Sequence, residues 1–386
     1  MARAKEDVAW AVVVTRNLPP LLGGMEKVNR HLVEALKADY RVAVCGPGGC
    51  SALISDAVVL ESKVKPLVLF LFGSLLRTLR ASFTYRPAVV LAGSGLTAPI
   101  AWLAARLVGA KAVVYLHGLD VVVPNRIYQK LWLPFIRRCD LVLVNSAHTA
   151  SLAIGRGVDS HVVKILNPGV TLPVLNEDEA THFRDRYDLG TSRLLLSVGR
   201  LTQRKGLAEF VAQSFPRILS DQPETLLIII GEDANDALHS RGGSERARIM
   251  AAARDAGVDG QLRFLGGCDD ATLCAAFQAC DLHVFPVLDL AGDVEGFGMV
   301  ALEAAAHGLP TLAFRVGGVP DAVEDGVTGA LLPSHDYIAF GEVALELLRV
   351  PHSSARLAAC REFAADKIWP LFGQRLLGWL TGVRSR

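Results

Sequence analysis

Short apolar runs alternate with longer amphipathic stretches along the whole chain. Runs of this length predict buried strands, and their regular alternation with helical stretches is typical of a parallel α/β sheet. In the first half the pattern predicts strands at Val8–Val14, Tyr40–Val44, Ala88–Leu91, Ala112–Leu116, Leu141–Val144 and Val162–Leu166. In the second half it predicts strands at Leu194–Val198, Leu226–Ile230, Leu262–Leu265, Leu282–Phe285, Thr311–Phe314 and Ala330–Leu332. The expected fold class is therefore α/β, with two doubly wound, Rossmann-like domains.

The series of predicted strands is interrupted once, where Asn167-Pro168-Gly169 ends the first half and a polar stretch follows. We therefore expect an N-terminal domain at residues 1–170 and a C-terminal domain at 171–365. A last helix at 366–386 is rich in apolar residues and is expected to pack back on the N-terminal domain. Doubly wound sheets bind ligands at the carboxyl ends of their strands, so we expect the chemistry in a central cleft that the two domains face.

Charge is divided unevenly between the halves. Residues 1–170 hold 20 Lys and Arg against 10 Asp and Glu, whereas residues 171–386 hold 20 against 29. No acidic residue lies between Glu61 and Asp120, and cations there alternate with leucine and phenylalanine. Basic and apolar residues at helical spacing favour a surface that rests on anionic lipid headgroups. The expected membrane contacts are Arg77, Arg80 and Arg86.

This basic segment has other interpretations. A solvated basic face over an ordinary core helix is the alternative. Nucleic acid is not an expected partner, because no helix-turn-helix, zinc finger or aromatic-basic sheet motif accompanies the cations. The longest apolar stretch, Pro66–Leu76, is shorter than the roughly 20 residues that a bilayer requires, so we do not expect a membrane span.

The composition is that of a packed globular protein, with 51% hydrophobic and 20% charged residues. The seven cysteines are odd in number, scattered and without a CxxC pair, which argues against a disulfide framework and a zinc ribbon. The chain contains no GxxxxGK[ST], HExxH or Asp-x-Asp motif, so neither a P-loop nor a metal site is expected. No signal sequence precedes the first predicted strand, and we expect a cytoplasmic protein.

The segment Asp293–Pro310 carries the strongest candidate chemistry. Glycines at 296 and 298 precede a strongly helix-forming run, which predicts a helix N-terminus with unpaired N–H groups that attract phosphate. The expected phosphate-binding groups are those of Phe297, Gly298, Met299 and Val300.

Two carboxylates flank this helix start. Glu303 is the only charged residue in its predicted helix, and burying a carboxylate without a partner costs several kcal/mol, so we expect it to face a polar ligand. Glu295 lies eight residues earlier, within about 12 Å along a helix. Such a pair can hold the two sugars on either side of a diphosphate. Alternatively, Glu295 stabilises the helix start and Glu303 is a buried ion-pair partner.

The loop after Leu194–Val198 contains the candidate cations. Arg200 and Lys205 follow the strand beside Gly199 and Gly206, where positive charge can stabilise a departing diphosphate. For Arg204 we expect the alternative, a solvated side chain in a basic loop.

Three residues of the first half are weaker candidates. Gly23 and Gly24 follow the first strand and leave room for a ligand to approach the backbone, although Gly-Gly is also an ordinary turn. His117 lies at the carboxyl end of a predicted strand, which places it closer to a substrate than to the core.

One pattern favours a different class of protein. Gly93, Gly95 and Ala98 match GxGxxA after a strand and before a helix, which resembles a dinucleotide-binding fingerprint with Asp120 as the ribose acid. An NAD(P)-dependent oxidoreductase is therefore an alternative.

Taken together, these motifs resemble those of the retaining glycosyltransferases of family 4, which have the GT-B architecture of two Rossmann-like domains. The resemblance covers nearly the whole chain and is strongest across Leu194–Leu332. It is carried by Glu295 and Glu303 of the Glu-x7-Glu motif, Val198-Gly199-Arg200, Lys205-Gly206, Gly23-Gly24, and the turns Gly317-Gly318-Val319-Pro320-Asp321 and Gly326–Gly329.

The resemblance implies a role for each matched residue. Glu295 would contact the donor sugar and Glu303 the ribose hydroxyls. Backbone amides at 297–300, with Arg200 and Lys205, would hold the diphosphate. His117 resembles the family histidine near the reaction centre, but Gly118 follows it where many members have aspartate.

The activity implied is transfer of a sugar from a nucleoside-diphosphate sugar to a hydroxyl group with retention of configuration, without a metal or another cofactor. The N-terminal domain would bind the acceptor and the C-terminal domain the donor. The form Asp293-Val-Glu295-Gly-Phe-Gly298 resembles the subgroup that acts on lipid-linked glycan acceptors, including enzymes that use GDP-mannose, which we favour slightly over a UDP-linked donor. We expect a peripheral enzyme of surface polysaccharide, lipopolysaccharide or glycolipid synthesis at the inner face of the cytoplasmic membrane. A sugar-nucleotide epimerase of the same fold and a non-catalytic nucleotide-sugar-binding protein are further alternatives.

Overall fold

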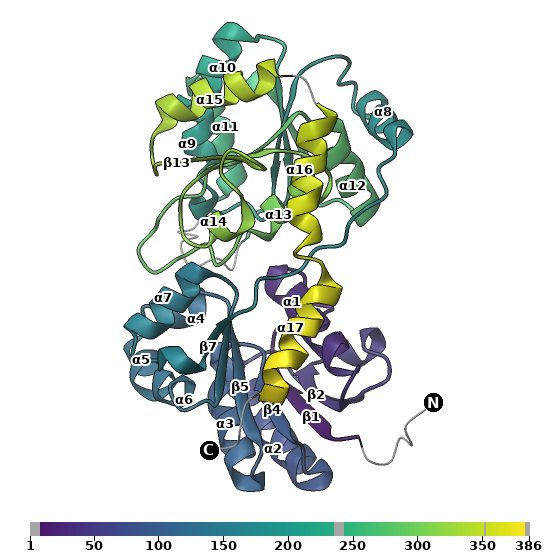
Figure 1. Cartoon of the computed structure of the whole chain (residues 1–386). Coiled ribbons are helices and arrows are strands. Elements are labelled where there is room, and N and C mark those ends of the chain that lie inside the picture. The colour runs from purple at the N-terminus through teal and green to yellow at the C-terminus, as the bar shows by residue number, and fades with distance from the viewer. Residues whose placement is uncertain (1–7, 235–242, 351–352, 383–386) are drawn as a thin grey trace. The chain divides into compact units, whose positions relative to one another are not determined.

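The computed structural model of the chain describes residues 8–234, 243–350 and 353–382 (Figure 1). The chain divides into two compact units, each a parallel sheet covered by helices. Unit 1 contains residues 1–169 together with 369–386, and unit 2 contains residues 170–368. The expectation of two doubly wound α/β domains is confirmed.

The seven-stranded sheet of unit 1 is parallel throughout, in the order β3-β2-β1-β4-β5-β6-β7. Its strands are β1 (Trp10–Val14), β2 (Arg41–Pro47), β3 (Val58–Ser62), β4 (Val89–Ala92), β5 (Lys111–Leu116), β6 (Leu141–Val144) and β7 (Val163–Ile165). In the interior strand β1, Val12 pairs with Ala43 on one side and Val90 on the other. Both faces of this strand are buried, which explains its uninterrupted apolar run. The sequence pattern missed β3.

Helices cover both faces of this sheet. They are α1 (Gly24–Leu36), α2 (Leu67–Tyr85), α3 (Ala98–Val108), α4 (Leu119–Val122), α5 (Arg126–Leu131), α6 (Leu133–Ile136), α7 (Ala147–Gly155) and α17 (Trp369–Gly382). Helix α17 packs along α1 (Figure 1). The indole of Trp369 stacks there on the imidazole of His31, with ring centroids 3.7 Å apart. The end of the chain thus belongs to unit 1.

Helix α2 corrects one expectation about length. It runs for 19 residues and is the one helix in the described ranges that is long and apolar enough to cross a membrane, by length and composition only. The apolar stretch that ends at Leu76 underestimates the length of this helix, because the helix continues through Arg77 and Arg80. Phe70, Ser74, Thr78 and Ala81 form a buried stripe on α2, which packs on β1, β2 and β3 and so covers the sheet.

Unit 2 contains a six-stranded parallel sheet in the order β10-β9-β8-β11-β12-β13. Its strands are β8 (Leu194–Val198), β9 (Leu226–Ile230), β10 (Leu262–Gly266), β11 (Leu282–Phe285), β12 (Thr311–Phe314) and β13 (Gly329–Leu332). Successive residues of β8 enter different cores, with Leu195 on one face and Leu194 and Leu196 on the other.

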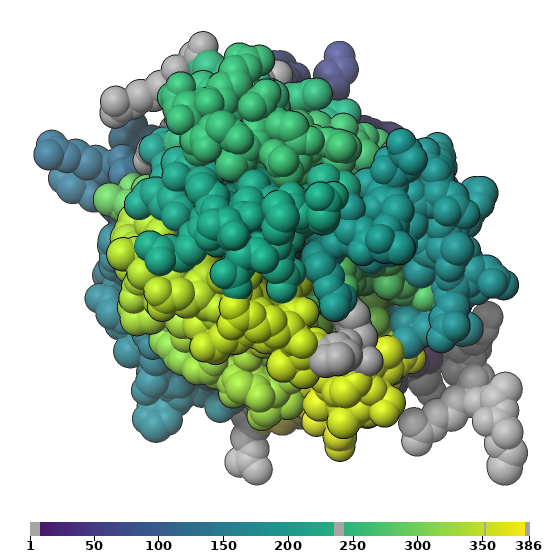
Figure 2. Space-filling view, turned by 90° about the horizontal axis from the view of Figure 1, so that it is seen from above, coloured from purple at the N-terminus to yellow at the C-terminus, as the bar shows by residue number. Residues whose placement is uncertain are grey.

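The helices of unit 2 also lie on both faces of its sheet. They are α8 (Glu177–Arg186), α9 (Leu207–Gln213), α10 (Phe215–Asp221), α11 (Glu245–Asp255), α12 (Asp270–Ala279), α13 (Met299–Ala306), α14 (Val319–Ala322), α15 (Tyr337–Arg349) and α16 (Ser354–Ala365). Helices α10 and α15 are far apart in the sequence but lie side by side in teal and yellow (Figure 2). In the core of unit 2, the Phe340 ring of α15 packs against Phe210 of α9 and Phe314 of β12, with ring centroids 5.4 and 5.0 Å apart.

Candidate active site

Four charged side chains of unit 2 meet where the loop after β8 approaches the loop before α13. Glu295 Oε2 accepts a hydrogen bond from Lys205 Nζ at 2.8 Å and a second from Arg204 Nη1. The same guanidinium reaches a second carboxylate, since Arg204 Nε lies 3.0 Å from Asp293 Oδ1. All four side chains are less than one fifth exposed. The sequence segments around residues 205 and 295, considered separately above, therefore form one site.

This site corrects the expectation for Arg204. We predicted a solvated side chain, but its side chain is only 15% exposed and is paired with two carboxylates. Local sequence spacing does not indicate this pairing, because the partners lie about 90 residues further along the chain. The candidate site therefore includes Arg204 and Asp293, two residues to which sequence analysis assigned no role.

The electrostatic balance keeps Glu295 ionised. Burial alone would raise the pKa of its carboxyl group, but Arg204 and Lys205 outweigh burial and hold that pKa at about 2. Burial lowers the pKa of Lys205, and the Glu295 carboxylate opposes that shift. A carboxylate compensated by two cations is a weak base and a weak nucleophile, and it is well suited to accept hydrogen bonds from hydroxyl groups.

Backbone hydrogen bonds hold the main chain of Glu295 and of Arg204 in place. The N–H of Gly318 donates to the carbonyl oxygen of Glu295 at 2.8 Å, and Gly317 has a left-handed φ of 55° that permits this turn. A Cβ atom on Gly317 would lie less than 3.0 Å from that carbonyl oxygen. On the other loop, the N–H of Leu288 donates to the carbonyl oxygen of Arg204 at 2.8 Å. The Gly317-Gly318 turn thus holds the backbone of Glu295 in place.

The helix beside the site lies where the sequence predicts it, after the glycines at 296 and 298. Helix α13 starts at Met299, and Gly298 precedes it with φ 93° and no side-chain cap. The N–H groups at this end, including those of Met299 and Val300, therefore have no intrahelical acceptor. Phe297 is not in the helix, and its side chain is buried in the unit 2 core. Glu303 is half-buried, on the second turn of α13.

The two predicted cations of the β8 loop differ in environment. Lys205 lies 4.6 Å from the centroid of the Phe285 ring, in addition to its contact with Glu295. Arg200 is exposed and close enough to Lys205 to lower the pKa of that ammonium group. Both side chains are thus in the neighbourhood of Glu295, with Arg200 the one that faces solvent.

In unit 1, hydrogen bonds link the ends of four strands. Nε2 of His117, after β5, lies 2.9 Å from the carbonyl oxygen of Gly93, after β4. Asn145, after β6, donates to the carbonyl oxygen of His117 at 3.1 Å, and Asn167, after β7, donates to that of Asn145 at 3.0 Å. A carbonyl partner requires a proton on Nε2, so Nδ1 of a neutral His117 is the acceptor nitrogen. Asn145 and Asn167 were not predicted from the sequence; Asn145 holds the backbone of His117, and Asn167 holds that of Asn145.

Local packing accounts for the glycines of unit 1. A Cβ on Gly23 would lie less than 3.0 Å from Glu26 Oε2, and Gly24 is the first residue of α1. A Cβ on Gly93 would meet Thr15 and Asn29, and one on Gly95 would meet Tyr128 within the same limit. The glycines of the GxGxxA pattern are thus explained by neighbouring side chains of unit 1, which leave no space for a Cβ at these positions. Asp120, its expected ribose acid, instead accepts a hydrogen bond from the backbone N–H of His117 at 2.9 Å.

The predicted membrane contacts lie on the surface of α2 and just beyond its end. Arg77, Arg80 and Arg86 are all exposed. Phe72 and Leu76, which are 60% and 52% exposed, share one side of this helix with Arg80, because the three recur at helical spacing. Arg80 and these two apolar side chains therefore form one mixed surface on α2.

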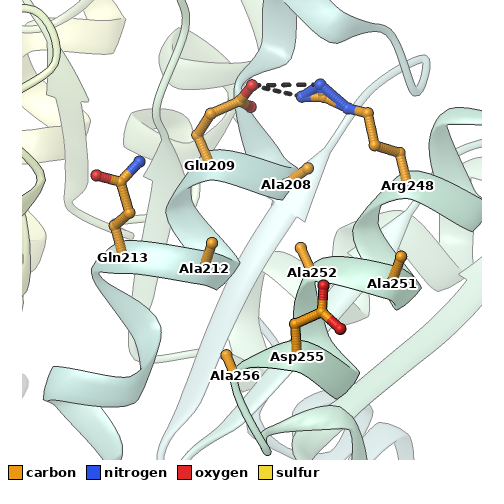
Figure 3. Close-up of a pocket in the computed structure, with 9 residues that line it drawn as sticks. All are labelled: Ala208, Glu209, Ala212, Gln213, Arg248, Ala251, Ala252, Asp255 and Ala256. Atoms are coloured by element: carbon orange, nitrogen blue, oxygen red, sulfur yellow. Dashed lines mark hydrogen bonds and ion pairs between the residues drawn. The ribbon is translucent and has the colours of Figure 1, made fainter.

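A pocket of about 480 Å³ lies elsewhere in unit 2, between α9 and α11 (Figure 3). Its walls are mostly alanine side chains, and the Glu209–Arg248 ion pair stands at one end. None of the predicted site residues lines it.

Comparison with protein families and known structures identifies this architecture. Residues 22–172 match the model of Glycosyltransferase Family 4, and residues 179–362 match that of glycosyl transferases group 1. The structure of Anabaena HepE in complex with UDP and glucose superposes with a TM-score of 0.78, at 17% identity over 97% of this chain and 100% of that one.

Two curated relatives have related activities. The GDP-mannose-dependent alpha-(1-6)-phosphatidylinositol monomannoside mannosyltransferase of Mycolicibacterium smegmatis is 28% identical over 97% of this chain and 99% of its own length. The D-inositol 3-phosphate glycosyltransferase of Mycobacterium tuberculosis is 28% identical over 61% of this chain and 47% of its own length. The chain belongs to the family 4 glycosyltransferases, with the GT-B fold, and is a glycosyltransferase.

Proposed function

We propose that this glycosyltransferase moves a sugar from a nucleoside-diphosphate sugar to a hydroxyl group of a lipid-linked glycan acceptor. The observation that carries the proposal is the cluster of Arg204, Lys205 and Glu295 beside the start of α13, because it combines cations, unpaired N–H groups and an ionised carboxylate. A GDP-linked donor such as GDP-mannose is favoured by the named activity of the mycobacterial mannosyltransferase. A UDP-linked donor is the second candidate, since HepE was crystallised with UDP.

The diphosphate would bind at the N-terminus of α13. The free N–H groups of Met299 and Val300 and the positive end of the helix dipole attract its oxygens. Lys205 and Arg200 would stabilise the charge that develops as the sugar leaves, without a metal ion. Glu303, one turn further along α13, would hold the ribose hydroxyls, and His117 would lie near the reacting sugar.

We infer that Glu295 positions the donor sugar and is not a nucleophile. Its charge is already compensated by Arg204 and Lys205, which weakens it as an attacking group. Transfer would then proceed with retention, and the leaving phosphate oxygen would take the acceptor proton. Mass spectrometry of wild-type protein incubated with donor tests this role, since a trapped glycosyl-enzyme that is missing from Glu295→Gln would contradict it.

We also propose that the enzyme works as a peripheral protein on an anionic membrane, at the inner face of the cytoplasmic membrane. The mixed basic and apolar surface of α2 supports this, and the named acceptor of the mycobacterial mannosyltransferase is a lipid. Each cation near an anionic surface contributes about 1 kcal/mol, so replacing Arg77, Arg80 and Arg86 by Gln should weaken vesicle binding by about 100-fold.

Co-sedimentation with vesicles of mixed neutral and anionic lipids measures this effect. The matched control replaces Arg217, Arg315 and Arg349, three exposed arginines of unit 2, and removes the same net charge. Equal binding by the two triple variants, or no binding by the wild type, would contradict the membrane proposal.

A nucleotide-sugar screen tests the donor and the reaction. Purified protein is heated with a panel of GDP- and UDP-sugars, and the donor that raises the melting temperature most is then incubated with candidate acceptors. The proposal predicts a glycosylated acceptor whose new linkage has, by NMR, the anomeric configuration of the donor. An inverted linkage contradicts retention. Conversion of the donor sugar to its epimer without an acceptor indicates a sugar-nucleotide epimerase instead.

A further inference from the structure

The two cations that hold Glu295 are bound differently. The Arg204 guanidinium contacts both carboxylates, Asp293 through Nε and Glu295 through Nη1, and the backbone of this residue is held by Leu288. Lys205 makes a single hydrogen bond to Glu295, and its ammonium group lies over the Phe285 ring. A planar guanidinium held at two points has one preferred orientation, whereas an ammonium group on a flexible stem can change partners.

A diphosphate can recruit Lys205 more readily than Arg204, because Lys205 is held by one hydrogen bond to Glu295 whereas Arg204 contacts both carboxylates. Asp293, Glu295, Arg204 and Lys205 form a neutral quartet in a mostly buried environment. A diphosphate that recruits Lys205 brings its own negative charge to that ammonium group. Glu295 would then depend on a remaining cation, because a buried carboxylate without one is strongly destabilised. Arg204 meets that need, and Asp293 fixes its orientation.

We propose that Arg204, oriented by Asp293, is the positioning residue that keeps Glu295 aimed at the donor sugar while Lys205 turns from Glu295 to the diphosphate. The inference rests on the proposed function and assigns different roles to the neighbouring cations Arg204 and Lys205. Lys205 binds the leaving group, and Arg204 acts only through the carboxylate it holds. Loss of Arg204 should therefore impair turnover far more than nucleotide binding, whereas loss of Lys205 should impair both.

The experiment measures GDP and UDP affinity by calorimetry, together with kcat and KM for the donor identified above. For Arg204→Gln we expect the nucleotide Kd to stay within about threefold of wild type and kcat to fall about 100-fold, the usual effect of a misplaced reacting group. For Lys205→Gln we expect the nucleotide Kd to rise at least tenfold, since a charge-assisted contact to phosphate is lost.

Two further variants separate positioning from general damage to the fold. Arg204→Lys keeps the charge but loses the two-point contact, so kcat should recover partly, and Asp293→Asn should lower kcat with nucleotide Kd unchanged. Arg315→Gln is the matched control, because Arg315 forms an exposed ion pair with Asp325 in the same unit, and its kinetics should equal those of wild type. If Arg204→Gln does not fold, Arg204→Lys and Asp293→Asn carry the test.

The outcomes discriminate between this inference and the function on which it rests. Wild-type protein that binds neither GDP nor UDP would overturn the proposed function and this inference with it. If wild type binds nucleotide but the Arg204 variants lose affinity as much as Lys205→Gln does, Arg204 is a diphosphate ligand and only the inference falls. Unchanged kcat in Arg204→Lys and Asp293→Asn would also overturn it.

Discussion

Replacing Gly317 by Ala should displace Glu295 and thereby reduce both stability and turnover. Gly317 has φ 55°, where an L-residue other than glycine costs about 1 kcal/mol. Its new Cβ would stand less than 3.0 Å from the carbonyl oxygen of Glu295, so that oxygen would have to move by about 0.5 Å or more to reach a normal contact. The shift would also weaken the hydrogen bond from Gly318, which contributes about 1 kcal/mol.

The total expected cost is about 2 kcal/mol. For a unit of this size, that lowers the melting temperature by about 4 to 8 °C. A displacement of half an ångström at a positioning carboxylate should also lower kcat by about tenfold. Gly326 provides a matched control, because its φ of 78° is equally unfavourable for alanine but no heavy atom lies within 4 Å of its Cβ position.

Differential scanning calorimetry and donor turnover measure both effects. Gly326→Ala should lose only the backbone term, about 1 kcal/mol or 2 to 4 °C, with kcat unchanged. The reasoning is refuted if the two variants melt at the same temperature and turn over donor at the same rate, because the close approach to Glu295 would then have no consequence.

Two further predictions concern pH. The pKa of Glu295 is held at about 2, below its usual value of 4.5, so its ion pairs stabilise the protein above pH 4.5 and this contribution is lost as the pH falls towards 2. The difference in melting temperature between wild type and Glu295→Gln should therefore shrink as the pH falls from 4.5 to 2. A constant difference would contradict the pairing. Burial beneath Trp369, with Lys27 and Arg30 nearby, lowers the pKa of His31 to about 4 from 6.5, so folded protein loses stability as the pH falls from 6.5 to 4. His31→Phe keeps a ring for the stack and should show a smaller loss between pH 7 and pH 5 by calorimetry, whereas equal losses would contradict this origin.

The strands of both sheets could be predicted from the sequence wherever both faces are buried. Leu194–Val198 and Leu282–Phe285 were predicted with the bounds observed, because burial on two sides demands an uninterrupted apolar run. Strand β3 was missed because it lies at the edge of the sheet, is only half-buried, and ends in Glu61 and Ser62. A polar end and partial exposure remove the pattern on which the prediction depends.

The candidate site was only partly predictable, for a different reason. Glu295 and Lys205 stood out because each has an unusual local context, with glycines beside it. Arg204 and Asp293 did not, because their importance comes from a contact between two loops about 90 residues apart. Gly317 was seen as part of a typical turn, but only the structure shows that it leaves space for the Glu295 carbonyl oxygen. Roles that arise from contacts between loops are not encoded in local spacing.

The position of the diphosphate in a crystal of the protein grown with GDP or UDP tests the central claim most directly. Our account predicts phosphate oxygens within hydrogen-bonding distance of Lys205 Nζ and of the N–H groups that begin α13, while Arg204 remains paired with Glu295. A diphosphate bound at another place in unit 2, with Lys205 still paired to Glu295, would contradict the account.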